Sequence, residues 1–217
     1  MAPVIAREYA KRGSRVVVVT VADSQAELFA RNTMNTLKTL TAIAENNEMY
    51  LPIMQYDNDT LSRSAVDQIM CKDICTLVHL LHDDATEVDR NDRLNFLDGK
   101  KTFGARPGLR LLKVYRGKYN EETEQPLFSP DATEQYDAVL NVGAPDLVTP
   151  APQYTRFRKD GAFVKNTVPT MGLISSNLDP LNSQLDRIEK VLHVTKTQEK
   201  PVIVSRLTPS GDSDLVL

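Results

Sequence analysis

The segment of residues 59–82 constrains the fold most, because no proline or glycine interrupts it. Its apolar residues recur three and four positions apart, which is the spacing of one helical face. They are Val66, Ile69, Met70, Ile74, Leu77, Val78 and Leu81. Cys71, Cys75 and Leu80 widen this stripe. We therefore predict a central core helix that other elements enclose on most sides.

The composition is that of an ordinary folded chain. Of the 217 residues, 41% are hydrophobic and 25% are charged, which is enough to bury a core. The net charge of -3 gives no reason to expect a nucleic-acid or membrane-surface partner. The two cysteines lie four positions apart and form no disulfide framework, so we expect a reducing cytoplasm.

The first half of the sequence alternates between helical and strand patterns. Helices are predicted at residues 3–12 and 32–45, and strands at 15–22 and 51–56. The regular part of the helix at 59–82 would start at Ser64, because Ser64 and Asp67 have the spacing of a capping box. This alternation is typical of a parallel α/β sheet, in which ligands bind outside the carboxyl ends of the strands. The polar loops at residues 23–27 and 57–59 follow two such ends.

The run of four valines at residues 16–19 is typical of a parallel strand covered on both faces. Without a neighbour on each side, this strand would be an exposed sheet edge, which favours pairing with other chains. We therefore expect the isolated chain to aggregate or to bind another chain.

The second half is predicted to be a smaller mixed sheet with at least one helix. A short helix at 92–97 ends at a break at 98–99, and a glycine-containing loop at 104–108 marks a subdomain boundary. Strands are predicted at 109–116, 136–142, 167–175 and 201–207, an extended segment at 145–152, and a helix at 180–193. Pro169 would confine its strand to an edge or a bulge. The fold class is thus α/β: a parallel sheet with a central helix at 1–103, a mixed α+β subdomain at 104–207, and a tail at 208–217.

Three stretches resemble the tubulin/FtsZ superfamily, and most closely the tubulin-like proteins of large bacteriophages. The segment 32–44 is similar to the family's helix after the loop that touches the ribose, and 51–58 to its strand and guanine-contacting turn. The segment 88–97 is similar to its synergy loop. The resemblance implies a tubulin-like fold, GTP with Mg²⁺ as the cofactor, and self-association into filaments.

The family's glycine-rich phosphate loop would lie upstream of Pro3, and no glycine-rich turn of this kind occurs among the nine scattered glycines. We therefore expect this chain alone to bind GTP poorly and to be a GTPase only when an N-terminal half completes it. That half would be a separate polypeptide or a truncated upstream part. Alternatively, the domain has a structural role without nucleotide.

Asp89 and Asp92 are the candidate catalytic residues. The resemblance implies that these carboxylates enter the next subunit's nucleotide pocket and position water for attack on the γ-phosphate. The alternative from the residues themselves is an acidic loop that caps the following helix.

Asn32, Asn58 and Asp67 are the candidate nucleotide-binding residues. By resemblance, Asn32 would lie near the ribose or phosphate, and Asn58 and Asp67 would contact guanine. The alternatives are helix capping for Asn32 and a turn or capping position for Asn58.

Cys71, Cys75 and His79 follow one another at intervals of four residues, with His82 nearby, which raises the question of a metal site. The predicted burial of both cysteines favours core packing, and the two histidines suit the carboxyl end of a helix. We predict no metal site.

Two functions from different classes follow. The first is a filament-forming, phage tubulin-like GTPase, of which this chain is the carboxyl-proximal part, in the cytoplasm of an infected bacterium. The second is a structural phage protein, in the particle or its assembly, that has a tubulin-like fold and no nucleotide turnover. A generic α/β binding domain is a third, weaker interpretation.

Overall fold

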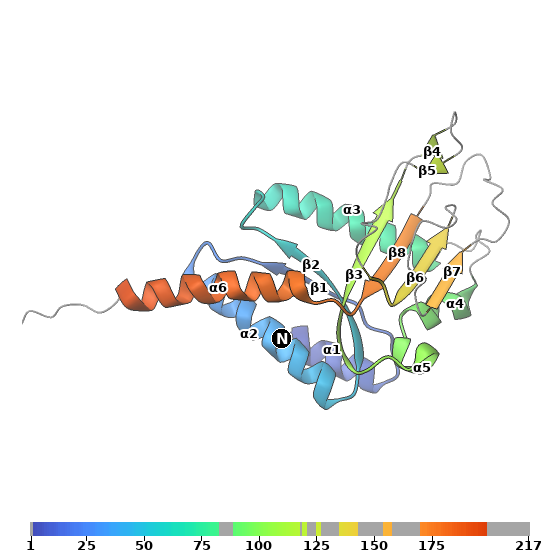
Figure 1. Ribbon diagram of the computed structural model, residues 1–217, viewed down its shortest axis with the longest axis horizontal. Helices are drawn as coiled ribbons and strands as arrows, with labels where there is room; N and C mark the ends of the chain where they lie inside the picture. The colour runs from blue at the N-terminus through green and yellow to red at the C-terminus, as the bar shows by residue number, and fades with distance from the viewer. Residues whose placement is uncertain are drawn as a thin grey trace, which may run out of the picture.

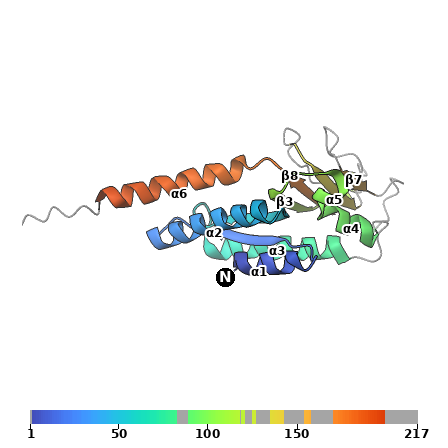
Figure 2. The same ribbon diagram turned by 90° about the horizontal axis from the view of Figure 1, so that it is seen from below.

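The computed structural model contains one large sheet with helices on both faces (Figures 1 and 2). It describes residues 2–82, 89–117, 119–120, 125–126, 135–142, 154–157 and 170–198. The helices are α1 (Ala2–Lys11), α2 (Glu27–Asn46), α3 (Arg63–His82), α4 (Arg90–Phe96), α5 (Gly99–Phe103) and α6 (Asp179–Gln198). The strands are β1 (Val18–Ala22), β2 (Tyr50–Asp57), β3 (Gly108–Arg116), β4 (Tyr119–Asn120), β5 (Gln125–Pro126), β6 (Ala138–Val142), β7 (Tyr154–Phe157) and β8 (Thr170–Ser175).

The strand order of the large sheet is β1-β2-β3-β8-β6-β7, and β4 and β5 form a separate hairpin. The first three strands are parallel, β8 is antiparallel to both of its neighbours, and β6 and β7 are again parallel. The predicted α/β class is confirmed. The sheet joins strands from both predicted segments, because β2 of the first pairs with β3 of the second.

Alternating side chains of the strands build a separate core on each face of the sheet. On one face, Leu51 and Ile53 of β2 pack with Leu37 and Leu40 of α2. On the other, Met54 of β2 belongs to a cluster with side chains of α3, α4 and β3. Figure 1 shows the same layers, with α3 on one side of β1 and β2 and α2 on the other, and α6 packs along α2.

The prediction that α3 is enclosed on most sides is wrong. Cys71 and Cys75 are exposed, and Ile69 and Val78 are 41% and 52% exposed. The reason is geometric: α3 covers one face of the sheet, and its outer side carries no other element among the described residues. The proposed capping box is also wrong, because α3 begins at Arg63 and the hydroxyl of Ser62 accepts the hydrogen bond from Ala65 N (3.3 Å).

Other boundaries differ for local reasons. The predicted break at 98–99 instead starts α5, because Asp98 caps this helix by accepting from Lys101 N at 3.3 Å. The edge position predicted for the strand with Pro169 is wrong, since β8 begins at Thr170 and lies in the middle of the sheet. The predictions for 145–152, 201–207 and 208–217 concern segments outside the described residues.

β1 is an edge strand within the described part of the chain, where β2 is its one pairing partner. Its outer side adjoins a cavity between α1 and β1 that is lined by Ile5, Ala6, Tyr9 and residues 14–19. Apolar side chains thus border an unpaired strand edge, which is a surface prone to pairing with other chains.

We predict that the purified chain self-associates through β1. Val21→Lys places a charge at an edge position that is 37% exposed, so it should reduce association at little cost in stability. Static light scattering across a concentration series measures the effect. A wild-type chain that stays monomeric throughout would contradict the prediction.

Gly172 in β8 allows the close approach of α3 and α4 to the sheet. A Cβ at this position would lie 2.7 Å from Leu80 Cδ2 and 3.0 Å from Phe96 Cζ. We predict that Gly172→Ala lowers the free energy of unfolding by about 1–3 kcal/mol through overpacking. Leu80→Ala removes the nearest clashing atom, so the double variant should lose less stability than the sum of the two single variants. Urea denaturation tests both expectations, and strict additivity would contradict the proposed clash.

Candidate nucleotide cleft

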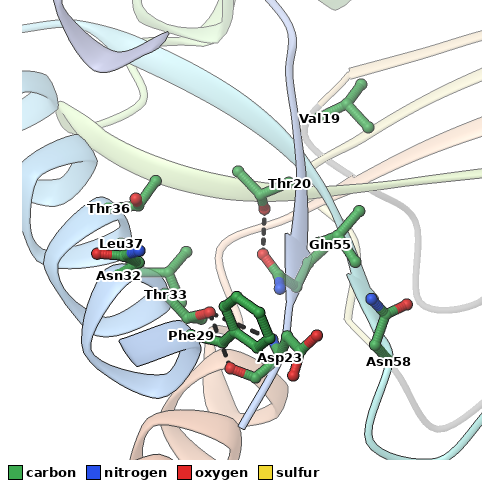
Figure 3. A pocket seen from close by; sticks show the side chains of 11 residues that line it. Val19, Thr20, Asp23, Phe29, Asn32, Thr33, Thr36, Leu37, Gln55 and Asn58 are labelled. Atoms are coloured by element: carbon green, nitrogen blue, oxygen red, sulfur yellow. Dashed lines mark hydrogen bonds between the residues drawn. The ribbon is translucent and has the colours of Figure 1, made fainter. Parts of the chain in front are cut away.

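A cleft of about 420 Å³ lies at the carboxyl ends of β1 and β2, beside the amino-terminal half of α2 (Figure 3). Its walls are formed by Val19, Thr20, Val21, Asp23, Phe29, Asn32, Thr33, Thr36, Leu37, Gln55 and Asn58. The parallel register pairs Ala22 with Asp57, so the loops that follow the two strands start next to each other. The cleft is therefore at the position where parallel α/β sheets bind their ligands.

Each of the two loops is shaped by an aspartate that hydrogen-bonds to the backbone two residues later. Asp23 Oδ1 accepts from Gln25 N at 3.0 Å, and Asp57 Oδ1 accepts from Asp59 N at 2.8 Å. This is the turn chemistry for which aspartate is favoured. The same aspartate turn therefore follows both strands.

Hydrogen bonds between the two loops hold them together. Ser24 donates to Asp59 twice, from its backbone N to Oδ1 (2.7 Å) and from its hydroxyl to Oδ2 (2.5 Å). Gln25 Nε2 donates to the backbone oxygen of Asn58 at 2.9 Å. Hydrogen bonds to a carboxylate are among the stronger ones in proteins, so the loops form a preorganised rim for the cleft.

Two arginines brace the loops from outside. Arg187 of α6 forms an ion pair with Asp57 at 2.7 Å. Arg63 of α3 forms one with Asp23 at 3.4 Å. Residues far apart in the sequence thus stabilise the same rim.

Two of the predicted nucleotide-binding residues, Asn32 and Asn58, line this cleft from opposite sides (Figure 3). Asn32 lies within α2, which starts at Glu27, so the alternative that it caps the helix is wrong. Asn58 lies in the turn after β2, and its buried Oδ1 has no hydrogen-bond partner among the described residues. Leaving a buried acceptor unpaired costs free energy, and a ligand that donates a hydrogen bond to it removes that cost.

Asp67 does not lie with them. It is an exposed residue of α3 and is absent from the lining of the cleft. Its role in contacting guanine stays a prediction.

Asp89 and Asp92 lie at the start of α4. Asp89 caps this helix, since its Oδ1 accepts from Asp92 N at 2.8 Å. The first residue of α3, Arg63, pairs with Asp23 of the cleft, whereas Arg93 of α4 donates to Leu81 O near the other end of α3 (Figures 1 and 2). The 20 residues of α3 correspond to a length of roughly 30 Å. One copy of the chain therefore does not bring these carboxylates near Asn32 or Asn58.

The prediction that Cys71 and Cys75 pack in the core is wrong, since both are exposed on the outer side of α3. Among the described residues, no group of three or more His, Cys, Asp or Glu side chains could hold a metal ion. No helix in the described part of the chain is long and apolar enough to span a bilayer.

Of the residues that line the cleft, only Asn32 and Asn58 were predicted as site residues, and those that were missed include Phe29, Thr33 and Gln55. Phe29 lies in the segment 28–31, for which no element was predicted, because α2 begins five residues earlier than expected. Gln55 belongs to the predicted strand at 51–56, and its direction toward α2 follows from alternation with Ile53. That alternation was the available signal.

No protein-family model and no curated protein matches this chain. Solved structures do. The phage tubulin PhuZ with GDP is 21% identical with a TM-score of 0.67, and the similarity covers 98% of this chain and 66% of that one. The PhuZ201 filament is 17% identical with a TM-score of 0.71 over 98% of this chain and 66% of that one. The protofilament of TubZ from bacteriophage PhiKZ is 15% identical with a TM-score of 0.69, and the similarity covers 99% of this chain and 64% of that one.

The chain thus spans just under two thirds of the length of these phage tubulins. At identities of 21% and below, the similarity establishes the architecture. The resemblance inferred from the sequence is confirmed at this level: the chain has a tubulin/FtsZ-like fold.

Proposed function

We propose that this chain is the carboxyl-proximal part of a filament-forming, phage tubulin-like GTPase. The observation that carries the proposal is that Asn32 and Asn58 line one cleft at the carboxyl ends of β1 and β2. This cleft occurs in a fold shared with a GDP-bound phage tubulin and with two phage-tubulin filament structures.

The residues of the cleft suit the base and ribose of a nucleotide better than its phosphates. Asparagine and glutamine amides, threonine hydroxyls and an aromatic ring line it, and no described glycine, lysine or arginine does. A phosphate cradle requires backbone N–H groups of a glycine-rich turn. The phosphate-binding loop, and with it Mg²⁺, would therefore be supplied by a part of the protein outside these 217 residues.

Hydrolysis would require two copies. The cleft and α4 lie at opposite ends of α3, so a head-to-tail contact between copies would bring Asp89 and Asp92 of one to the nucleotide of the next. Such heterologous contacts extend into filaments when the rotation does not close a ring. In this arrangement Asp89 or Asp92 orients the attacking water and accepts its proton, as the catalytic aspartate of protein kinases accepts the proton of the attacking hydroxyl.

The partners implied are further copies of this chain and the polypeptide that carries the phosphate loop. The expected location is the cytoplasm of an infected bacterium.

A structural phage protein with the same fold and no nucleotide turnover is the second candidate, in the particle or its assembly. It is favoured by two observations: no glycine of the described part of the chain lines the cleft, and Asp89 already has a structural role as the cap of α4. Recovery of the chain from purified particles, without GTP hydrolysis, would support this function.

We predict GTP hydrolysis by the chain mixed with the product of the upstream reading frame, and little by either alone. Asp89→Ala and Asp89→Ser should both lower the rate by about 100-fold or more, because both remove the carboxylate. Serine can still cap α4, so it separates catalysis from capping. Asp186→Ala, at an exposed acidic position of α6, is the control and should leave the rate unchanged. Hydrolysis by the Asp89→Ser variant at the wild-type rate would contradict the catalytic role.

A further inference from the structure

Phe29 has an exposure that the packing of the fold does not explain. It lies in the first turn of α2, where the residue is 40% exposed, and it belongs to none of the hydrophobic core clusters that the described residues form. It lines the cleft together with Asn32 and Asn58. A half-exposed aromatic ring in the wall of a cleft is suited to contact with a ligand.

The ring is held in place by Arg63, whose guanidinium carbon lies 5.5 Å from the ring centroid. The same guanidinium forms the 3.4 Å ion pair with Asp23. Because Asp23 belongs to the loop after β1 and Arg63 to the start of α3, the ring is positioned by elements on both sides of the cleft. A cation over an aromatic face is attractive, modestly so at exposed sites, and therefore favours this orientation of the ring.

The side chain opposite the ring supplies a complementary polar contact. Asn58 lies across the cleft (Figure 3), and its buried Oδ1 is without a partner among the described residues. A planar heterocycle with N–H donors on its edge satisfies both features, because its face stacks on Phe29 and its edge donates to Asn58. The cleft volume of about 420 Å³ lies in the range of small-ligand sites.

We propose that Phe29 is the platform on which the guanine base stacks, and that Arg63 is the positioning residue that orients it. This inference rests on the proposed function. It adds a base-specific contact from α2, and it predicts that base recognition is present in this chain without the phosphate loop.

The test uses guanosine, which lacks phosphates, with the full 217-residue chain. Stacking on Phe29 should shift the guanosine H8 resonance upfield, and titration gives the affinity. Phe29→Leu should abolish the upfield shift and weaken binding roughly 5- to 100-fold, which is the range for loss of one stacked base. Phe29→Tyr should retain both. Arg63→Ala should reduce the shift while leaving measurable binding, since the ring remains.

Leu28→Ala is the matched control. Leu28 is the sequence neighbour of Phe29, is 64% exposed, and does not line the cleft, so its truncation should change neither shift nor affinity. Thermal unfolding of each variant confirms that it is folded.

Two results would overturn the inference: no guanosine-induced shift at millimolar concentration, or equal shifts with the wild-type chain and the Phe29→Leu variant. The GTP hydrolysis assay with the upstream product tests the proposed function, and its outcome is independent of the guanosine titration. Guanosine stacking without GTP hydrolysis would leave this inference standing and remove the proposed enzyme. GTP hydrolysis by the Phe29→Leu variant with an unchanged KM would overturn this inference and leave the proposed enzyme standing.

Discussion

The parallel pairing of β1 with β2 is the constraint on which the rest of the site depends. Its register, from Val18 opposite Ile53 to Ala22 opposite Asp57, makes both strands end at the same level. Two short polar loops then begin side by side, and the hydrogen bonds of Ser24 to Asp59 join them. A shift of one residue would turn the alternating side chains to the opposite face and separate the loops.

The helices determine how the cleft and α4 are placed relative to each other. α2 covers one face of the sheet and supplies one wall of the cleft, whereas α3 starts beside the cleft and crosses the other face toward α4. The length of α3 separates the cleft residues Asn32 and Asn58 from the carboxylates at the start of α4. In the proposed function, each end of such a chain would carry one half of the active site, and turnover would therefore depend on assembly.

Much of the fold could be predicted from local patterns. The valine run, the 3,4 spacing of apolar residues and the loop aspartates predicted β1, α2, α3 and the place of the cleft. The burial of α3 could not be predicted in this way. Its wide apolar stripe has the composition of a fully enclosed helix, but which sides are covered depends on neighbours far away in the sequence. Pro169 also led to a wrong prediction of an edge strand. Proline restricts the strand that contains it, but β8 begins at Thr170, one residue later.

The site was predictable in part. Asn32 and Asn58 were chosen by resemblance and line one cleft, whereas Asp67 lies outside its lining. Phe29 gave no signal, because its role as a cleft residue depends on the extra first turns of α2 and on Arg63 from another element. Contacts between elements of this kind become visible when the chain is folded.

The central claim is that the cleft of one copy meets α4 of the next. Cysteine cross-linking between copies measures this contact directly. In a background with Cys71→Ser and Cys75→Ser, a chain with Asn58→Cys is mixed with a differently tagged chain with Asp89→Cys, together with the upstream product and GTP. We predict a GTP-dependent disulfide between the two tagged chains and none within a chain that carries both substitutions. A disulfide within one chain, or none between copies in assembled material, would contradict the claim.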